Sequence, residues 1–520
     1  MTDIAQAGIA PTGPDGRSVH TSGDARKRLA RRYAAERRFR RAGLSAVLLA
    51  IGFLLALLST VVGKAIPAFT YTYAALPLDL AGDRINQDDP ARSNFDAIVK
   101  AAIAEALPFV SGRKERRAAR GLISSGAAVI LRDVIADDPA LIGATRTIGL
   151  PVSDTLDLYF KGLTAATITR QPQGSATPSE TSGTIRLAVE PGVIGADEQF
   201  GRNTPSRLVF INGGVVKITG ADGEGLQGDV LAPLQSAAPA APGDWRLMTI
   251  SQPESARKIS DREIAYAEML NEKGLIESRF NSIFFTRGAS REPEMAGVWG
   301  AVVGSFFTML VTLALSFPLG VASAIYLEEV APKNHWTQLI EVNINNLAAV
   351  PSIVFGLLGL AVFLNFFGLP RSAPVAGGMV LALMTLPTII IASRAALSAV
   401  PPSIREAALG IGASRMQMVF HHVLPLAMPG ILTGTILGVA RALGETAPLL
   451  MIGMVAFIVD IPGGALQPAT VLPVQIFMWA DFPEPGFQQK TAAAIMVLLG
   501  FLVVMNAFAV LMRQRFERRW

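Results

Sequence analysis

The chain has 520 residues, of which 51% are hydrophobic and 17% are charged, with a formal net charge of +5. In soluble domains about a quarter of all residues are charged. The apolar residues here also form runs long enough to cross a bilayer, so a purely soluble protein is excluded. There is no cysteine, which excludes disulfides, thiolate metal sites and cysteine nucleophiles. The positive charge lies at the chain ends rather than in a stripe that would bind nucleic acid.

The N-terminal part combines a polar segment, a basic block and an apolar run. Residues 1–23 are rich in Gly, Pro, Ser and Asp and are expected to be disordered. The basic block could be a targeting peptide or a nucleic-acid arm, but it runs directly into the apolar segment Leu44–Val62, which is longer than a signal-peptide core. The positive-inside rule therefore predicts a cytoplasmic segment 1–41 and a first transmembrane helix over 42–66. The block comprises Arg26, Lys27, Arg28, Arg31, Arg32, Arg37, Arg38, Arg40 and Arg41.

Residues 67–295 are polar and form a predicted extracytoplasmic domain of mixed α/β structure. The stretch Ser93–Val134 reads as helical, whereas Thr184–Val189 and Arg207–Ile218 alternate like strands. A Pro/Ala-rich linker is expected over Ser236–Asp244, and a final helix over Asp261–Phe285 leads back to the membrane. No nucleotide-binding glycine loop, catalytic triad or metal-ligand cluster occurs here, so the sequence assigns no chemistry to this domain.

Five more apolar runs predict transmembrane helices over 298–326, 347–367, 375–395, 431–459 and 492–511. Six crossings that start inside place residues 67–295 outside and the C-terminus inside. The charges agree, because the loop 396–430 holds several arginines and the outer loop Asp460–Gln489 holds no basic residue. The predicted fold class is an α-helical polytopic membrane protein.

Arg441 and Glu445 are the conspicuous charges within these runs. They lie one helical turn apart, about eleven residues or roughly 16 Å into the run Ile431–Val459, near the middle of a hydrocarbon core. A charge at that depth is costly unless it is paired or lines a wet cavity. Thr446 adds a hydroxyl, and Pro448 removes a helical N–H group. Two interpretations stay open: these residues line or gate a substrate path, or they form a structural ion pair that locks the helix to a neighbour.

The loop 396–430 is amphipathic. A helix is favoured from Ser403 and includes Glu406-Ala407-Ala408, and Gly410 and Gly412 break or bend it. A second short helix is expected over Ser414–His422, ending at Leu424-Pro425. The small side chains allow another protein to approach closely. The alternative is a helix–turn–helix that rests on the membrane surface.

The loop resembles the EAA loop of ABC-importer permeases. The resemblance rests on Glu406-Ala407-Ala408, on Gly412 and on Leu424-Pro425 after a fixed gap. In that family the loop docks into a groove on a separate ATPase subunit and transmits its closure to the membrane helices. This sequence departs from the pattern at His422, where an aliphatic residue is usual, and Val423 is an alternative occupant of that site.

Further segments are similar to phosphate-specific permeases of the Pst system, and to the A-type subunit rather than its C-type paralogue. The strongest is "TGTILGVARALGETAPLL" (Thr433–Leu450). The polar insert is similar to the N-terminal extension of some proteobacterial A-type permeases. The other matching segments are Pro318–Glu329, Asn346–Leu360 and Val471–Ala480.

The resemblance implies a type I ABC importer permease fold of six transmembrane helices, with the mixed α/β periplasmic insert between helices 1 and 2. It implies a multi-pass protein of the bacterial inner membrane, with both termini cytoplasmic, that moves inorganic phosphate by alternating access. The implied partners are a C-type permease, two ATPase subunits, a periplasmic phosphate-binding protein and the lipid bilayer, with no nucleic acid. The chain has no Walker-type loop, so it is expected to be no enzyme and to hold no cofactor, ATP being used by the partner ATPase.

The implied site residues fall into two groups. Arg441, Glu445 and Thr446 are assigned to the substrate path or gate, and no residue is assigned to catalysis or metal binding. Two alternatives remain: an importer of another oxyanion or an amino acid, or a component whose outer domain is mainly sensory or scaffolding. The residues assigned to ATPase coupling are Glu406, Ala407, Ala408, Gly412, Leu424 and Pro425.

Overall fold

The structure is a computed structural model that describes residues 23–81, 85, 92–164, 167–181, 184–190, 193, 199–201, 203–222, 225–455 and 457–516. The disorder expected for residues 1–23 therefore falls, except for Gly23, outside the described residues. The chain divides into two compact units, Met1–Gly63 and Lys64–Trp520.

The described part of the first unit lies in one long helix, α1 (Gly23–Ala65), which ends two residues beyond that unit. The basic block is helical and continues without a break into the apolar run, because Ala, Arg and Leu are all good helix formers. The prediction of a separate basic segment before the first helix is wrong in this respect. The stretch Lys27–Phe69 is long and apolar enough to span a membrane.

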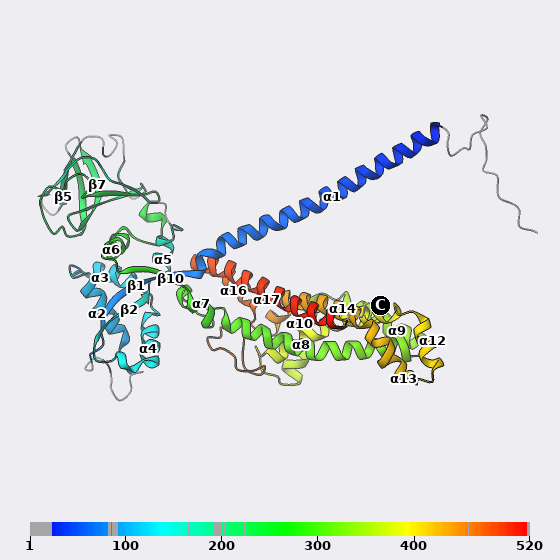
Figure 1. Ribbon diagram of the computed structural model, residues 1–520. Helices are drawn as coiled ribbons and strands as arrows, with labels where there is room; N and C mark the ends of the chain where they lie inside the picture. The colour runs from blue at the N-terminus through cyan, green and yellow to red at the C-terminus, as the bar shows by residue number, and fades with distance from the viewer. Residues whose placement is uncertain are drawn as a thin grey trace, which may run out of the picture. The chain divides into compact units, whose positions relative to one another are not determined.

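The polar domain of the second unit, called the outer domain after its predicted location, has two lobes (Figure 1). The first lobe is built on an antiparallel sheet of order β10-β1-β2, formed by β1 (Thr70–Asp79), β2 (Thr145–Pro151) and β10 (Ile276–Phe280). A single apolar core joins this sheet to its helices. These helices are α2 (Phe95–Ala106), α3 (Arg113–Gly121), α4 (Ala127–Asp137), α5 (Asp154–Phe160) and α6 (Asp261–Glu272).

The second lobe is an antiparallel sheet of order β3-β9-β6-β7-β8-β5-β4. The β6–β7 hairpin turns at Asn212-Gly213, which have φ angles of 47° and 70°, as a two-residue hairpin turn requires. The strands are β3 (Thr167–Arg170), β4 (Ala176–Thr181), β5 (Thr184–Val189), β6 (Ser206–Ile211), β7 (Gly214–Asp222), β8 (Gly225–Ala232) and β9 (Arg246–Ile250).

The predicted strand over 184–189 and the helices within 93–134 are confirmed, and the alternating stretch 207–218 forms parts of two strands, β6 and β7, joined by a turn. Two expectations for this domain are wrong. The segment Ser236–Asp244 is no linker, because Ala240 pairs with Ala176 and the segment closes the second lobe. The expected helix Asp261–Phe285 is interrupted by β10, which finds its partner in β1, about two hundred residues earlier. Local sequence does not reveal so distant a pairing.

The membrane part comprises the helices that follow the outer domain. Within the described residues, five helices of the chain are long and apolar enough to cross a membrane, or six if one bent pair counts as one span. The helices are α7 (Ser282–Thr286), α8 (Trp299–Ile325), α9 (His335–Ala348), α10 (Ser352–Gly359), α11 (Pro374–Ser398), α12 (Pro402–Gly410), α13 (Arg415–Gln417), α14 (Leu424–Gly444), α15 (Ala447–Met451), α16 (Leu472–Ala480) and α17 (Gly486–Phe516).

Three predicted spans have different bounds in the structure. The span 347–367 bends by 101° between α9 and α10, because Pro351 is extended and starts a new helix. The span 492–511 begins earlier, at Gly486. The span 431–459 is not one helix: α14 begins at Leu424 and ends at Gly444, and the short α15 follows.

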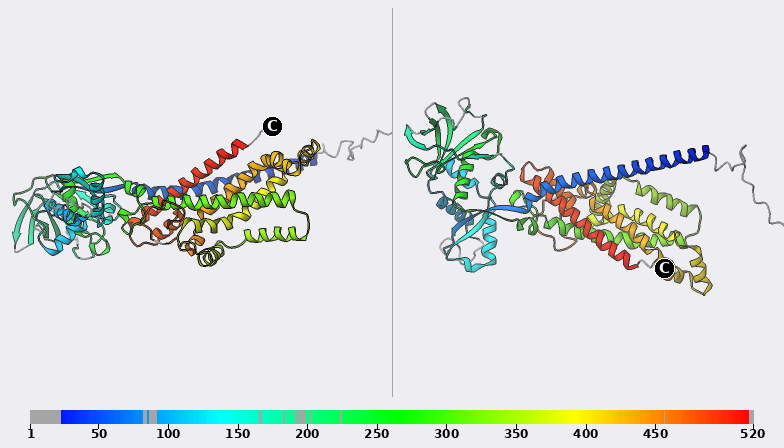
Figure 2. Two further views of the ribbon diagram at one scale, coloured as in Figure 1. Left: turned by 90° about the horizontal axis from the view of Figure 1, so that it is seen from below. Right: turned by 45° about the horizontal axis from the view of Figure 1, so that its top comes forward.

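Small residues let the central helices approach closely, as is common in membrane bundles. A Cβ on Gly378 of α11 would lie 2.5 Å from Val311 of α8, and one on Gly434 of α14 would lie 2.1 Å from Ala392 of α11. Thr312 donates hydrogen bonds to the carbonyls of Thr308 and Gly378, which confirms the backbone bonding typical of a threonine inside a membrane helix. In both views of Figure 2, α12 and α13 lie at the end of this bundle opposite the outer domain.

Candidate functional site

The loop 396–430 begins with the helix α12. Pro401 precedes the helix and Pro402 is its first residue, a position where a missing N–H group costs nothing. Ala408 is buried among the side chains of α8, α11 and α14, whereas Glu406 and Ala407 are exposed. The helix therefore presents Glu406 and Ala407 outward while Ala408 anchors it to the bundle.

Gly412 ends this helix with a Schellman motif. Its φ of 91° is in the left-handed region, where a side chain is unfavourable. The Ala413 N–H group donates to the Ala408 carbonyl and the Gly412 N–H group donates to the Leu409 carbonyl. The sharp turn projects Ile411, which is 81% exposed, beside the exposed Leu409.

The same loop exposes a set of large apolar side chains. We call it the loop patch; large apolar side chains are rarely grouped on an exposed turn without a partner. Its members are Leu409, Ile411, Met416 and Phe420.

The second half of the loop runs directly into α14. Ser414 caps α13 through a reciprocal pair of hydrogen bonds with Gln417. A π-helical turn over Met418–Val423 follows and continues into α14, so that Arg415–Gly444 is one span-length helix. The predicted helix end at Leu424-Pro425 is therefore wrong. Pro425 lacks an N–H group and would clash with the carbonyl four residues earlier, and the wider turn relieves this clash.

Val423, rather than His422, is the buried residue at the position where the EAA pattern expects an aliphatic side chain. Val423 is fully buried in the cluster that also contains Ala408, whereas His422 is half-buried. Of these two residues, Val423 is thus the one whose burial suits an aliphatic site.

Arg405 is a connecting residue that the sequence reasoning counted only as a positive charge. Its guanidinium pairs with Glu329, with Nη2–Oε1 at 2.8 Å, at the π-helical turn Tyr326–Val330 that ends α8. It also donates to the Leu397 and Val400 carbonyls at the end of α11, at 2.9 and 2.6 Å. The helix α12 is thereby fastened to two membrane helices. A basic residue directly before Glu406 was the only sequence signal.

A second arginine links the same end of the bundle. Arg394 of α11 lies 2.8 Å from the Glu341 carboxylate of α9 and 3.5 Å from that of Glu328. These contacts attach α9, whose residues are otherwise exposed or half-buried, to α11.

Arg441 and Glu445 lie at the end of α14, not within a continuous helix. Arg441 is in the last helical turn, and Glu445 is extended, with φ −77° and ψ 125°. The Arg441 Nε atom is 3.6 Å from the Glu445 carboxylate, and the Arg441 side chain is 57% exposed. Among the described residues it makes no ion pair to another helix. This argues against a pair that locks α14 to a neighbour in this chain.

Thr446 precedes α15, and its carbonyl accepts hydrogen bonds from Leu449 and Leu450. Its hydroxyl caps no backbone group. Pro448 lies near the start of α15 and packs closely on α10, where a Cβ on Gly356 would be 2.7 Å from the Pro448 Cα. The three residues that the sequence analysis assigns to a path therefore lie together at a break between two helices, with α15 packed on α10.

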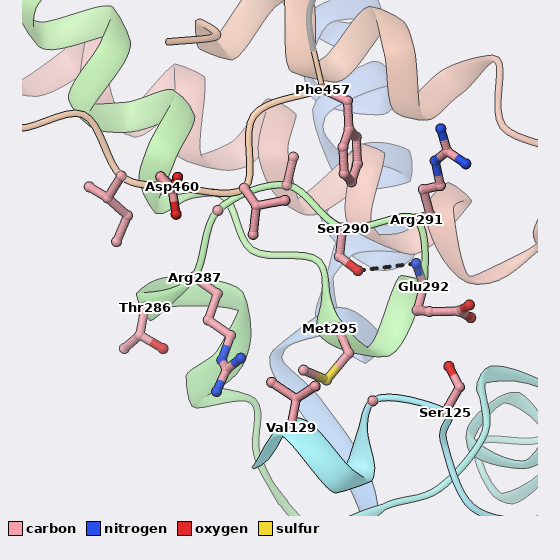
Figure 3. Close-up of a pocket in the computed structure, with 15 residues that line it drawn as sticks. Ser125, Val129, Thr286, Arg287, Ser290, Arg291, Glu292, Met295, Phe457 and Asp460 are labelled. Carbon is pink, nitrogen blue, oxygen red and sulfur yellow. Dashed lines mark hydrogen bonds between the residues drawn. The ribbon is translucent and has the colours of Figure 1, made fainter. Parts of the chain in front are cut away.

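A cavity of about 620 Å³ lies between the first lobe and the loop that follows α15 (Figure 3). Arg287 on its wall is 2.5 Å from Asp133 of α4, and the Arg291 guanidinium lies 5.7 Å from the Phe457 ring centroid. Both arginines thus already have partners, and the remaining wall is mainly apolar. The lining includes Val129, Ala289, Met295, Val459 and Ile461. No group of His, Asp or Glu side chains in the described part of the chain is arranged to hold a metal ion.

Two protein-family models match the chain. Residues 316–520 match the binding-protein-dependent transport system inner membrane component family. Residues 26–170, which cover α1 and most of the first lobe, match a domain of unknown function (DUF3333).

The chain is similar to several bacterial permeases. It is 34% identical over 173 residues to the probable ABC transporter permease protein YqgI of Bacillus subtilis, a match covering 33% of this chain and 58% of that protein. The chain thus spans little more than half of that relative. It is 31% identical to the phosphate transport system permease protein PstA 1 of Mycobacterium tuberculosis, covering 45% of this chain and 76% of that protein. It is 30% identical to the phosphate transport system permease protein PstA of Haemophilus influenzae, covering 44% of this chain and 80% of that protein.

Among solved structures, an inward-facing MetNI methionine ABC transporter is 18% identical, with 43% of this chain and 95% of that chain covered and a TM-score of 0.33, too low to support an argument. The family match over 316–520 and the PstA similarity agree with the helical membrane part and with its loop at 396–430. The chain belongs to the PstA-type phosphate transport system permeases, a family of non-catalytic membrane subunits of ABC transporters.

Proposed function

We propose that this chain is a permease subunit of an ATP-driven importer that moves inorganic phosphate across the bacterial inner membrane. The observation that carries the proposal is the continuous helix Arg415–Gly444, which has the coupling loop at one end and Arg441 at the other. A push on the loop would move a single rigid element that ends at the charged pair. The length of α14 alone is about 30 Å at 1.5 Å per residue.

Phosphate fits the chemistry of the charged pair. A guanidinium presents donors that match two phosphate oxygens, and it stays charged when partly desolvated. Glu445 neutralises Arg441 while the path is empty and can accept a hydrogen bond from a protonated phosphate. Sulfate, a dianion without a proton, lacks that donor. The half-exposed Arg441 side chain leaves the fork free to meet a substrate.

The loop patch and Glu406 are the proposed contact with a separate ATPase. The chain would pair with a C-type permease and work with two ATPase subunits and a periplasmic phosphate-binding protein, with both termini and the loop 396–430 in the cytoplasm. ATP-driven closure would tilt α14 and switch the side of the membrane to which Arg441 is open. Arg405 and Arg394 would carry the same motion to α8, α11 and α9.

The test is phosphate uptake by the intact complex in liposomes. Arg441→Ala and Arg441→Lys should each abolish uptake while the complex still assembles, because neither keeps the two-point fork. Normal transport in either variant would refute the path role. Competition by sulfate and molybdate would reveal a different oxyanion as the substrate.

A second candidate function is sensing or scaffolding by the outer domain. The size of the domain, which contains two apolar clusters of its own, supports it. Deleting residues 71–279 and measuring both uptake and phosphate-responsive transcription separates the two roles. Loss of the transcriptional response with uptake intact would favour the sensory role.

A further inference from the structure

The outer domain and the membrane part of the second unit meet in a tightly packed seam. Asp154, at the start of α5, accepts a hydrogen bond from the Gly486 N–H group, the first residue of α17, at 3.2 Å. A Cβ on Gly486 would lie 1.8 Å from Asp154. A Cβ on Gly126, the residue before α4, would lie 2.4 Å from Met295, which lies just before α8. The first lobe is therefore fitted to the outer ends of both α8 and α17.

Lys490 lies one turn into α17 and is almost fully buried at this seam, with 4% exposure. Its ammonium group donates to the Ala296 carbonyl at 2.6 Å and lies 5.7 Å from the Phe284 ring centroid. The charged groups that act on it are Glu294, Asp157, Asp154 and Lys161. A buried ammonium needs such partners to remain in place.

The acidic groups at the seam outnumber the amino groups. Asp157, which is 2% exposed, is paired with Lys161 at 2.5 Å and accepts from the Thr72 N–H group. Lys490 can neutralise only one of the two remaining carboxyls, Asp154 and Glu294. Glu294 is 3% exposed, and its Oε2 atom has no hydrogen-bond partner among the described residues. The three carboxyls and two amino groups of this buried cluster therefore lack one positive charge.

We propose that Asp154, Glu294 and Lys490 form a proton-binding site that clamps the outer domain onto the outer ends of α8 and α17. A bound proton supplies the missing positive charge while the seam is closed. Loss of the proton leaves a buried carboxylate without a compensating charge. This carboxylate favours opening of the seam, because it is then hydrated. The outer domain thus acts as a clamp on two membrane helices, and its hold depends on the pH outside the membrane.

The pKa shifts of the two carboxyls support this site. Burial raises the pKa of Asp154 to about 6, with Asp157 raising it further and the Gly486 N–H group, Lys490 and Lys161 opposing. Burial raises the pKa of Glu294 to about 7, with Glu292 and Asp154 adding to the rise and the Ser124 hydroxyl opposing it. Tyr71 also faces both carboxyls, and burial raises its pKa well above its usual value, so it stays neutral.

The sign of the pH effect follows from these directions. Both carboxyls have a higher pKa in the closed seam than in water, where it is about 4, so closing the seam takes up protons. The closed form is favoured most below the free pKa and loses that advantage as pH rises to the closed-state pKa of about 6 or 7. In that window the closing constant falls about tenfold per pH unit for each proton bound.

Hydrogen exchange of the Gly486 amide tests the proposal in the full chain in lipid nanodiscs. This amide is protected only while it donates to Asp154. After correction for the intrinsic exchange rate, its protection should fall at least tenfold between pH 5 and pH 7. The double variant Asp154→Asn, Glu294→Gln keeps the acceptor and mimics the protonated site, so its protection should change little between pH 5 and pH 7.

Two further variants separate a proton site from ordinary packing. Lys490→Met should move the step to higher pH, because removing the cation favours the protonated carboxyls. Asp133→Asn, at the Arg287 pair on the same seam, should keep the wild-type slope. If the double variant fails to fold, Glu294→Gln alone should reduce the slope. A flat wild-type profile, or a slope retained in the double variant, would overturn the proposal, and neither outcome depends on the transported substrate.

Discussion

The Arg405 guanidinium and the Glu329 carboxylate form an ion pair through two nitrogens, with Nη2–Oε1 at 2.8 Å and Nε–Oε1 at 3.2 Å, that joins α12 to the end of α8. The Glu329 side chain is only 6% exposed. Because this carboxylate is shielded from water, removing its partner leaves a buried, uncompensated charge.

Arg405→Ala should therefore uncouple ATP hydrolysis from transport. Breaking a buried pair costs about 3 kcal/mol, enough to release α12 from α8 while the rest of the bundle stays folded. We expect phosphate transported per ATP to fall at least tenfold in liposomes. The double reversal Arg405→Glu, Glu329→Arg should recover part of the coupling, and Arg415→Ala, an exposed arginine of the same loop, should have little effect. Wild-type coupling in Arg405→Ala would refute the role.

Glu406→Lys should weaken attachment of the ATPase. The side chain is exposed beside the loop patch, so the change reverses a charge without disturbing the bundle. Co-purification of the ATPase should fall at least tenfold. His421→Lys adds a positive charge at another exposed position of the loop and serves as the control. An undiminished, substrate-stimulated ATPase in the Glu406 variant would count against the assignment.

Gly410 and Gly412 of the loop should respond in opposite ways to alanine. Gly412→Ala forces a side chain into the left-handed region, at a cost of about 1–2 kcal/mol. Gly410→Ala lies within α12 with open space around its Cα, and should stabilise the helix by up to about 1 kcal/mol. Hydrogen exchange of α12 measures both. Equal protection in the two variants would show that the turn is not fixed by Gly412.

Asp261 should control the acid stability of the outer domain. It is 1% exposed and contacts Lys217, Ser206 and Arg257. Burial alone would raise its pKa, but the Lys217 hydrogen bond and the Arg257 charge outweigh burial and hold the pKa below its ordinary value. Its contribution is thus complete above the unfolded pKa of about 4 and is lost as pH falls through the lower folded value.

Asp261→Asn should accordingly destabilise the outer domain by about 3 kcal/mol at neutral pH and reduce its sensitivity to acid. Hydrogen exchange of α6 between pH 3 and pH 7 measures both effects. Asp96→Asn disrupts an exposed pair with Lys100 at the same four-residue spacing, and should change stability by less than about 0.5 kcal/mol. Similar losses in the two variants would contradict the buried network.

The sequence located the membrane part well because hydropathy reports burial in lipid directly. It failed where a backbone break lies inside an apolar run. Nothing in the hydropathy of Ile431–Val459 shows that Glu445 is extended and that α14 ends at Gly444. The proline at 448 was the available signal, but a proline can either kink a helix or begin a new one.

Contacts between distant segments were also beyond a reading of local pattern. Arg405 and Glu329 are 76 residues apart, and Asp154 and Gly486 are 332 apart. Each residue alone reads as an ordinary surface charge or a loop glycine. Lys490 falls just ahead of the predicted last span, so its burial at the seam was not anticipated.

The β1–β10 ladder brings together the two ends of the outer domain. The register pairs Thr70 with Phe280, so the two places where the chain enters and leaves the outer domain are neighbours in space. A domain with adjacent ends can be added to a permease at one short connection without moving the helices on either side. The ladder marks the point in the chain where such a domain could be inserted. If the domain were deleted there, the two remaining ends would be close enough to be joined.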